Sequence, residues 1–91
     1  MAAYLYILEC ADGQRYTGIA NDLKQRLADH QAGRVLPTAW RLPARLVYFE
    51  QHEALHQARQ RERSLKGGRT RRASIEYMIA TFPREKLAPF A

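Results

Sequence analysis

Cysteine occurs only once in the 91-residue chain, at Cys10, so no disulfide can form within it. No apolar run is long enough to cross a membrane. The first ten residues, MAAYLYILEC, include no charged region of the kind that opens a signal peptide. From these absences we expect a cytoplasmic protein with no membrane partner. We also expect a single domain over residues 1–91, with a core over about 3–82 and a short C-terminal tail.

Acidic residues are few beside basic ones, 9 against 15, which gives a formal net charge of +6. A charge of this sign favours polyanionic partners, with nucleic acid ahead of an anionic surface. Seven of the basic residues fall within residues 59–72. The hydrophobic content of 46% is typical of a folded domain and not of a disordered chain.

Apolar periodicity and turn-forming residues predict six elements. They are strands over 3–9, 15–19 and 44–51, a helix from Asn21 or Asp22 to about residue 31, a helix over 53–66, and a last helix capped by Thr70 and closed by Pro83. Residues 33–43 are expected to form a loop. The order strand-strand-helix-strand-helix-helix predicts an α+β fold with a small three-stranded antiparallel sheet flanked by helices.

One carboxylate interrupts the apolar stripe of the helix expected over 53–66. Leu55, Ala58, Glu62 and Leu65 follow helical spacing, so Glu62 falls on the face expected to meet the core. Burying a carboxylate is costly unless it is paired, hydrogen-bonded or bound to a metal. Glu62 is therefore a candidate metal ligand, or else an edge residue in an ion pair with a neighbouring arginine.

Arg26 and His30 are four residues apart on the first expected helix and therefore share a face. A guanidinium beside an imidazole is suited to holding a phosphate, because arginine presents a planar fork of donors. The alternative is an ordinary solvated helix face.

These residues together resemble the GIY-YIG nuclease family. The first motif corresponds to Tyr4-Leu5-Tyr6 and the second to Tyr16-Thr17-Gly18, followed in order by Arg26, His30 and Glu62. The resemblance covers residues 3–66 and is nearest to small stand-alone bacterial members. Tyr4 stands where the motif has glycine, and Thr17 where it has isoleucine. The one asparagine, Asn21, does not supply the asparagine that many members have after the glutamate.

The resemblance implies metal-dependent hydrolysis of phosphodiester bonds in nucleic acid, DNA ahead of RNA, with low sequence specificity. It implies one divalent ion, Mg²⁺ or Mn²⁺, on Glu62. Tyr6 would take a proton from the attacking water, and Tyr16 would orient the water or the phosphate. Arg26 would neutralise the phosphate, and His30 would contact the phosphate or the hydrogen bonds of the nucleophile. Arg26 and the metal are expected to lower the pKa of Tyr6.

Further contacts to nucleic acid are expected from the basic residues and from one tryptophan. The expected set is Arg41, Arg59, Arg63, Lys66, Arg69, Arg71, Arg72 and Trp40. Trp40 either stacks on an unpaired base or folds onto the core, and the basic run is either a phosphate-binding surface or a solvated helix face. We expect a monomer or a weak dimer.

Two other functions fit parts of the sequence. A non-catalytic module would bind nucleic acid through the basic residues alone. His52 to His56 reads HEALH, which matches the HExxH pattern of zinc proteases, with Glu53 as the base. That motif lies where a strand gives way to a helix, which is a poor context for two zinc ligands on one helix face.

The turn at Asp12-Gly13 decides whether Tyr6 and Tyr16 share a face of the sheet. A two-residue loop would pair Glu9 with Tyr16 and set the two tyrosines on opposite faces. A three-residue loop, with a left-handed Gly13, would instead pair Tyr6 with Gly18 and bring the tyrosines together. A shared site requires the second register, and we predict it.

Overall fold

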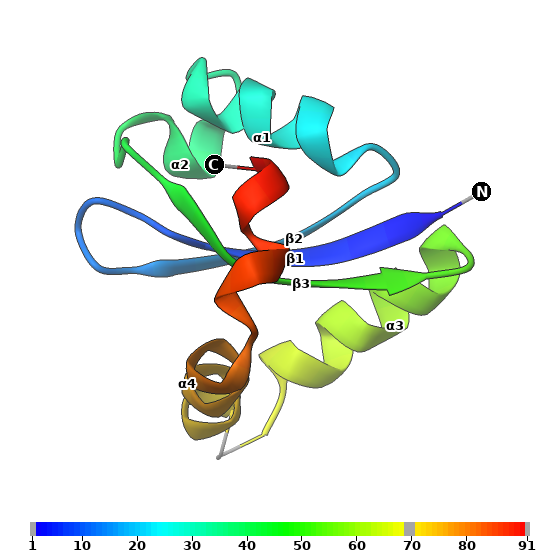
Figure 1. Cartoon of the computed structure of the whole chain (residues 1–91). Helices are drawn as coiled ribbons and strands as arrows, with labels where there is room; N and C mark the ends of the chain where they lie inside the picture. Colours follow the sequence, from blue (N-terminus) through cyan, green and yellow to red (C-terminus); the bar gives the residue numbers. More distant parts are fainter. Residues whose placement is uncertain (1, 69–70, 91) are drawn as a thin grey trace.

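The computed structural model describes residues 2–68 and 71–90. The elements are β1 (Ala3–Glu9), β2 (Arg15–Ala20), α1 (Leu23–Gln31), α2 (Leu36–Ala39), β3 (Arg45–His52), α3 (Leu55–Lys66), α4 (Arg71–Thr81) and two short 3₁₀ turns, Arg84–Lys86 and Ala88–Phe90. The strands form one antiparallel sheet in the order β2-β1-β3. Figure 1 shows the sheet edge-on, with α1 and α2 on one face and α3 and α4 on the other. The predicted α+β fold is confirmed.

The central strand β1 supplies most of the core because it is covered on both faces. Leu5 and Ile7 pack against α3 and α4, whereas Tyr6 and Leu8 point to the α1 side, and all four are fully buried. Strand residues alternate between faces, so one apolar run serves both layers. In the described part of the chain, no helix has the length and apolar character needed to span a membrane.

The segment expected to be a loop, residues 33–43, contains the short helix α2. Pro37 lies in its first turn, where the missing N–H costs nothing. Four residues are too few to show a helical period, so the sequence pattern could not predict this helix. Helix α1 begins as expected, since Asp22 caps it by accepting a hydrogen bond from the Gln25 amide at 3.0 Å. The expected cap Thr70 lies outside the described residues.

The chain after Pro83 folds back across the sheet. In Figure 1 it runs from α4 past β3 to the α1 side. The Phe90 ring meets the Phe49 ring at 5.2 Å, and Phe82 meets Phe49 at 5.2 Å. This closing segment therefore covers β3 with a row of aromatic edge contacts.

The first hairpin has the predicted three-residue register. Leu8 pairs with Tyr16 and Tyr6 pairs with Gly18. The loop closes with a hydrogen bond from the Cys10 amide to the Gln14 carbonyl at 2.9 Å, and Gly13 has a φ of 83°. Glycine enters this left-handed region without a steric penalty. The two tyrosines consequently lie on one face.

Gly18 is required by the space that the Tyr6 ring occupies. A Cβ atom at residue 18 would stand 2.5 Å from the Tyr6 hydroxyl oxygen and 2.6 Å from its Cζ. Contacts this short force the ring to move. The hairpin register thus places a glycine where the buried phenol needs the room.

Replacing Gly18 by alanine should displace the Tyr6 ring and lower the free energy of unfolding by about 1–3 kcal/mol, the usual cost of overpacking a core. Urea denaturation measures this. Gly67→Ala is the matched control, because among the described residues a Cβ there meets only the Arg63 carbonyl at 3.7 Å, and it should change stability by about 0.5 kcal/mol or less. Equal stability of the two variants would contradict the close packing at Gly18.

Candidate active site

A buried hydrogen-bond chain joins β1 to α1. The Tyr6 hydroxyl lies 2.8 Å from Nε2 of His30. The Arg26 Nε donates to the same hydroxyl oxygen at 3.4 Å. Tyr6 and His30 have no exposed surface, while Arg26 is half-buried at the rim. The four-residue spacing of Arg26 and His30 brings both side chains to one phenol, as the helical pattern predicted.

The hydrogen-bond chain continues from α1 to α2 through Thr38, a residue that the sequence pattern did not single out. Nδ1 of His30 lies 2.7 Å from Oγ1 of Thr38, and that hydroxyl donates to the Val35 carbonyl at 3.3 Å. Thr38 is fully buried. The sequence signal was weak, because Thr38 belongs to the short helix that no periodicity revealed.

The direction of each hydrogen bond follows from the groups at the two ends of this hydrogen-bond chain. Arg26 can only donate and the Val35 carbonyl can only accept. Every hydrogen is then used once if Tyr6 donates to Nε2 of His30, and Nδ1–H of His30 donates to Thr38. We therefore assign His30 as the neutral tautomer protonated at Nδ1.

Tyr16 completes an aromatic cluster around this chain. Its ring lies 5.1 Å from the His30 ring and 6.3 Å from the Tyr6 ring. It is half-buried, so it lies between the closed interior and solvent. Four of the five predicted catalytic residues, namely Tyr6, Tyr16, Arg26 and His30, meet on the α1 face of the sheet.

Burial sets the protonation of the central pair. It raises the pKa of Tyr6 to about 12 and outweighs the hydrogen bond from Arg26, which lowers that pKa. Arg26 thus lowers the pKa of Tyr6 as expected, but burial has the larger effect and keeps that pKa above its ordinary value. Burial, followed by the charge of Arg26, lowers the pKa of His30 to about 4. At neutral pH the pair is a phenol and a neutral imidazole.

Glu62 lies on α3, on the other side of the sheet from this cluster. Its side chain is 20% exposed, and its carboxylate accepts from Lys66 Nζ at 3.2 Å. Lys66, one helical turn on, is thus its ion partner, and not the neighbouring arginines that the sequence suggested. The negative charge of Glu62 also contributes to the raised pKa of Tyr6. The carboxylate therefore lies within electrostatic reach of the phenol.

A single carboxylate, such as that of Glu62, suits a metal ion that keeps most of its bound water. Among the described residues, no three His, Cys, Asp or Glu side chains gather to form a full ligand set. Mg²⁺ is commonly held by one or two carboxylates plus water and substrate oxygens. Glu62 is half-buried and, in the part of the chain that the structure describes, pairs only with an exposed lysine, which fits that mode of binding.

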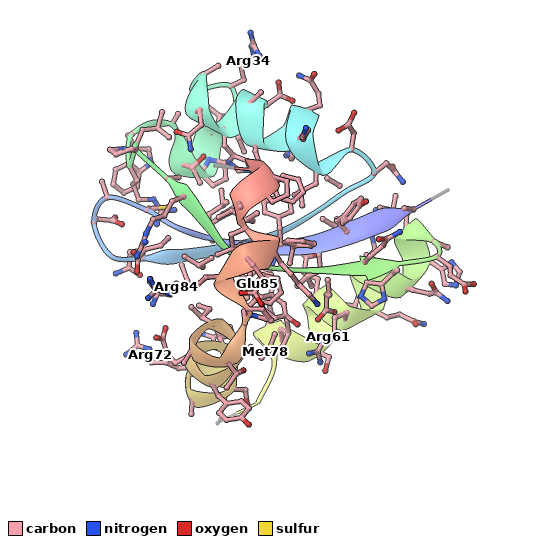
Figure 2. The ribbon with its side chains drawn as sticks, viewed as in Figure 1. Arg34, Arg61, Arg72, Met78, Arg84 and Glu85 are labelled. Carbon is pink, nitrogen blue, oxygen red and sulfur yellow. The ribbon has the colours of Figure 1, made fainter. Side chains whose placement is uncertain are left out.

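The basic residues expected to contact nucleic acid divide into two groups. Lys66, Arg71 and Arg72 line a common pocket between α3, α4 and β2. Arg59 and Arg63 are exposed on α3 and do not line that pocket. Figure 2 shows Arg72 on α4, at the end of the molecule opposite Arg34.

Trp40 is exposed and lies apart from the core, with 76% of its surface accessible. The Arg41 guanidinium lies 4.8 Å from the Trp40 ring, and its Nε donates to the Pro37 carbonyl at 3.0 Å. Arg41 therefore holds the loop around α2, which limits its freedom to meet a phosphate. Arg69, another predicted contact, lies outside the described residues.

The HEALH segment does not form a zinc site. His52 is the last residue of β3, and its Nε2 lies 2.8 Å from a Glu50 oxygen. His56 is exposed on α3. The two histidines belong to different elements and do not share a helix face, so the zinc-protease interpretation is wrong.

The low pKa of His30 makes stability depend on pH. The unfolded chain binds a proton at this residue below about pH 6.5, whereas the folded chain does so only near pH 4. The free energy of unfolding should therefore fall as the pH is lowered from 6.5 to 4, by up to about 3 kcal/mol from this residue. Urea denaturation across that range measures the slope.

His30→Gln should flatten that pH dependence, and His56→Gln, at an exposed histidine, should keep it. Equal slopes in the two variants would show that His30 titrates as freely as an exposed imidazole.

Comparison with known proteins finds relatives over most of the chain. The model of the GIY-YIG catalytic domain matches residues 2–74. UPF0213 proteins from Streptococcus pyogenes serotypes M5 and M2 are each 45% identical over 85 residues, which cover 92% of this chain and 91% of theirs. The solution NMR structure of a UPF0213 protein from Bacillus halodurans is 31% identical, with a TM-score of 0.54, and the match covers 89% of this chain and 95% of that one. The chain therefore belongs to the GIY-YIG family, within the nuclease superfamily, and its relatives are the small stand-alone UPF0213 proteins.

Proposed function

We propose that this protein is a metal-dependent nuclease that hydrolyses phosphodiester bonds in DNA with low sequence specificity. The observation that carries the proposal is the buried chain from Arg26 through Tyr6 and His30 to Thr38. Such a chain offers a route for a proton away from an attacking water. The Nε2 lone pair of His30, which accepts the Tyr6 hydroxyl hydrogen, is the group that would receive this proton.

The proton path follows from the assigned tautomer. The attacking water gives a proton to the Tyr6 oxygen as its own oxygen bonds to phosphorus and the P–O bond on the opposite side breaks. The leaving oxygen takes a proton from solvent. The hydroxyl hydrogen of Tyr6 passes at the same time along the 2.8 Å hydrogen bond to Nε2 of His30. His30 is then an imidazolium, and its Nδ1–H remains hydrogen-bonded to Oγ1 of Thr38. Tyr6 remains a phenol throughout, so its high pKa is no obstacle.

Substrate binding strengthens His30 as the acceptor. The positive charge of Arg26 is one cause of the low pKa of His30. A phosphate held by Arg26 brings negative charge to the same place and offsets that effect. The pKa of His30 therefore rises when substrate binds, and Arg26 also stabilises the charge that develops on the phosphate. Tyr16, at the opening of the cluster, orients the water or the phosphate.

Glu62 is the residue that would hold the divalent ion, Mg²⁺ or Mn²⁺. The ion supplies stabilisation of negative charge on the phosphate oxygens. Lys66 pairs with Glu62 from an exposed position, and such a pair is weak, so it would yield to a divalent cation. Lys66 would then be available to the nucleic-acid backbone.

Cleavage assays on single-stranded, double-stranded and branched DNA and on RNA, with Mg²⁺ or Mn²⁺, test the proposal. Tyr6→Phe should lower kcat by about 10²–10⁴-fold, because the proton relay is lost. Arg26→Ala should lower it by about 10²–10³-fold, because a charge donor to the phosphate is lost. Glu62→Gln should abolish the response to metal.

Two matched substitutions serve as controls. Tyr4→Phe alters a half-buried tyrosine of the same strand, and Glu53→Gln alters an exposed carboxylate just before α3. Both should cleave like the parent protein. Cleavage that survives Tyr6→Phe and Glu62→Gln would contradict the assigned site. Salt-dependent binding without cleavage under any condition would instead indicate a non-catalytic binding module.

A further inference from the structure

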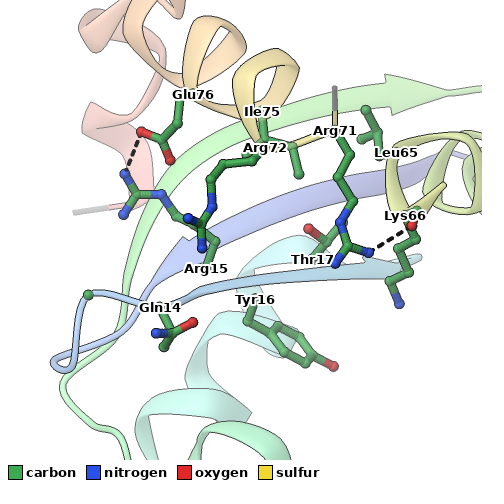
Figure 3. A pocket seen from close by; sticks show the side chains of 11 residues that line it. Gln14, Arg15, Tyr16, Thr17, Leu65, Lys66, Arg71, Arg72, Ile75 and Glu76 are labelled. Carbon is green, nitrogen blue, oxygen red and sulfur yellow. Dashed lines mark hydrogen bonds and ion pairs between the residues drawn. The ribbon is translucent and has the colours of Figure 1, made fainter. Parts of the chain in front are cut away.

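A pocket of about 600 Å³ lies where the first hairpin faces the end of α3 and the start of α4. We call it the β2–α4 pocket, and Figure 3 shows it from close by. Lys66, Arg71 and Arg72 supply positive charge, and Leu65 and Ile75 supply an apolar wall. A volume of this size is typical of pockets that enclose small ligands. One nucleotide would fit.

Two cations of the pocket keep hydrogen-bonding capacity for a ligand. Arg15 does not, since its guanidinium is held by the carboxylates of Glu9 and Glu76. Arg71 donates one bond to the Lys66 carbonyl at 2.8 Å. Within the described residues, neither Arg71 nor Arg72 forms an ion pair with a carboxylate. Their remaining donors match the oxygens of a phosphate.

The pocket adjoins the reaction site around the edge of the sheet. β2 is an edge strand, and Tyr16 belongs to the lining. In Figure 3 the Tyr16 ring points away from Arg71, toward the α1 side where His30 lies. Lys66, on the other side, is the ion partner of Glu62. A strand held at the reaction site would therefore reach the pocket by crossing the free edge of β2.

We propose that the β2–α4 pocket binds one unpaired nucleotide next to the bond that is cleaved. Its phosphate lies on Arg71 and Arg72, and its base lies against Leu65 and Ile75. This inference rests on the proposed nuclease function and names the substrate class: nucleic acid with at least one unpaired nucleotide beside the scissile phosphate.

The apolar wall is what favours an unpaired nucleotide over a duplex. A base inside a duplex is stacked and paired, and extruding it costs a few kcal/mol. A base that is already free gains contact chiefly with the half-buried Ile75, since Leu65 is only 5% exposed. A cationic patch without such a wall would bind the backbone of either form.

NMR titration of the ¹⁵N-labelled full chain tests the pocket without relying on cleavage. The probes are inorganic phosphate, thymidine monophosphate, a single-stranded oligothymidylate, a duplex of equal length and an acidic peptide. The oligothymidylate and the mononucleotide should shift the amides of Gln14, Thr17, Leu65 and Ile75, with tighter binding of the oligonucleotide. Phosphate should shift the amides of Arg71 and Arg72 alone.

Replacing both arginines by alanine should weaken binding of the oligothymidylate. Because both arginines hold the same phosphate, loss of that contact should lower the slope of log affinity against log salt by about 0.7, the value for one neutralised phosphate of a single strand. KM for a substrate with an unpaired nucleotide should rise with kcat unchanged, as expected for a lost binding contact. Arg34→Ala, at an exposed arginine opposite α4, removes one charge far from the pocket and should leave the slope unchanged.

The results separate this inference from the proposed function. Shifts at the pocket amides without any cleavage would support the pocket and contradict the hydrolysis. The inference is overturned if phosphate alone reproduces all the shifts, if the duplex or the acidic peptide binds the pocket as well as the single strand, or if the double variant behaves like Arg34→Ala. Circular dichroism verifies that the alanine variants, at exposed positions of α4, remain folded.

Discussion

The register of the first hairpin is the constraint on which the site depends. A three-residue loop, closed by the left-handed Gly13, pairs Tyr6 with Gly18 and Leu8 with Tyr16. A loop shorter by one residue would turn Tyr16 to the opposite face, because side chains alternate along a strand. The same register puts a glycine under the Tyr6 ring, where a Cβ would stand 2.6 Å from its Cζ. One turn thus sets both the pairing of the tyrosines and the room for the buried phenol.

Burial is the second determinant, and it works against ionisation. The core that β1 organises encloses Tyr6 and His30 completely. That environment raises the pKa of the phenol and lowers the pKa of the imidazole, so the pair is neutral at rest. Neutral partners can be buried at low cost when all their hydrogens are satisfied, and Arg26 and Thr38 satisfy them. The charged side chain that contacts this buried pair is that of Arg26, which is half-buried.

The sequence predicted the layers of the fold because β1 is apolar on both faces and the helices carry recognisable caps and stripes. It also predicted that Arg26 and His30 share a face and that Glu62 departs from its apolar stripe. It could not predict that Thr38 hydrogen-bonds to His30, because Thr38 lies in a four-residue helix, which is too short to show a helical period. Nor could it predict that Lys66 pairs with Glu62, or that Arg71 and Arg72 meet Leu65 in one pocket. Those contacts depend on how α4 packs against α3, which is a tertiary effect.

The proton relay depends on Tyr6 donating its hydrogen to Nε2 of a neutral His30. A long-range ¹H–¹⁵N correlation spectrum of the imidazole measures this directly, since the two ring nitrogens report their protonation separately. At pH 6 His30 should be neutral, with its proton on Nδ1 and no proton on Nε2, although a free histidine is largely protonated near that pH. An imidazolium signal at pH 6, or a proton on Nε2, would contradict it.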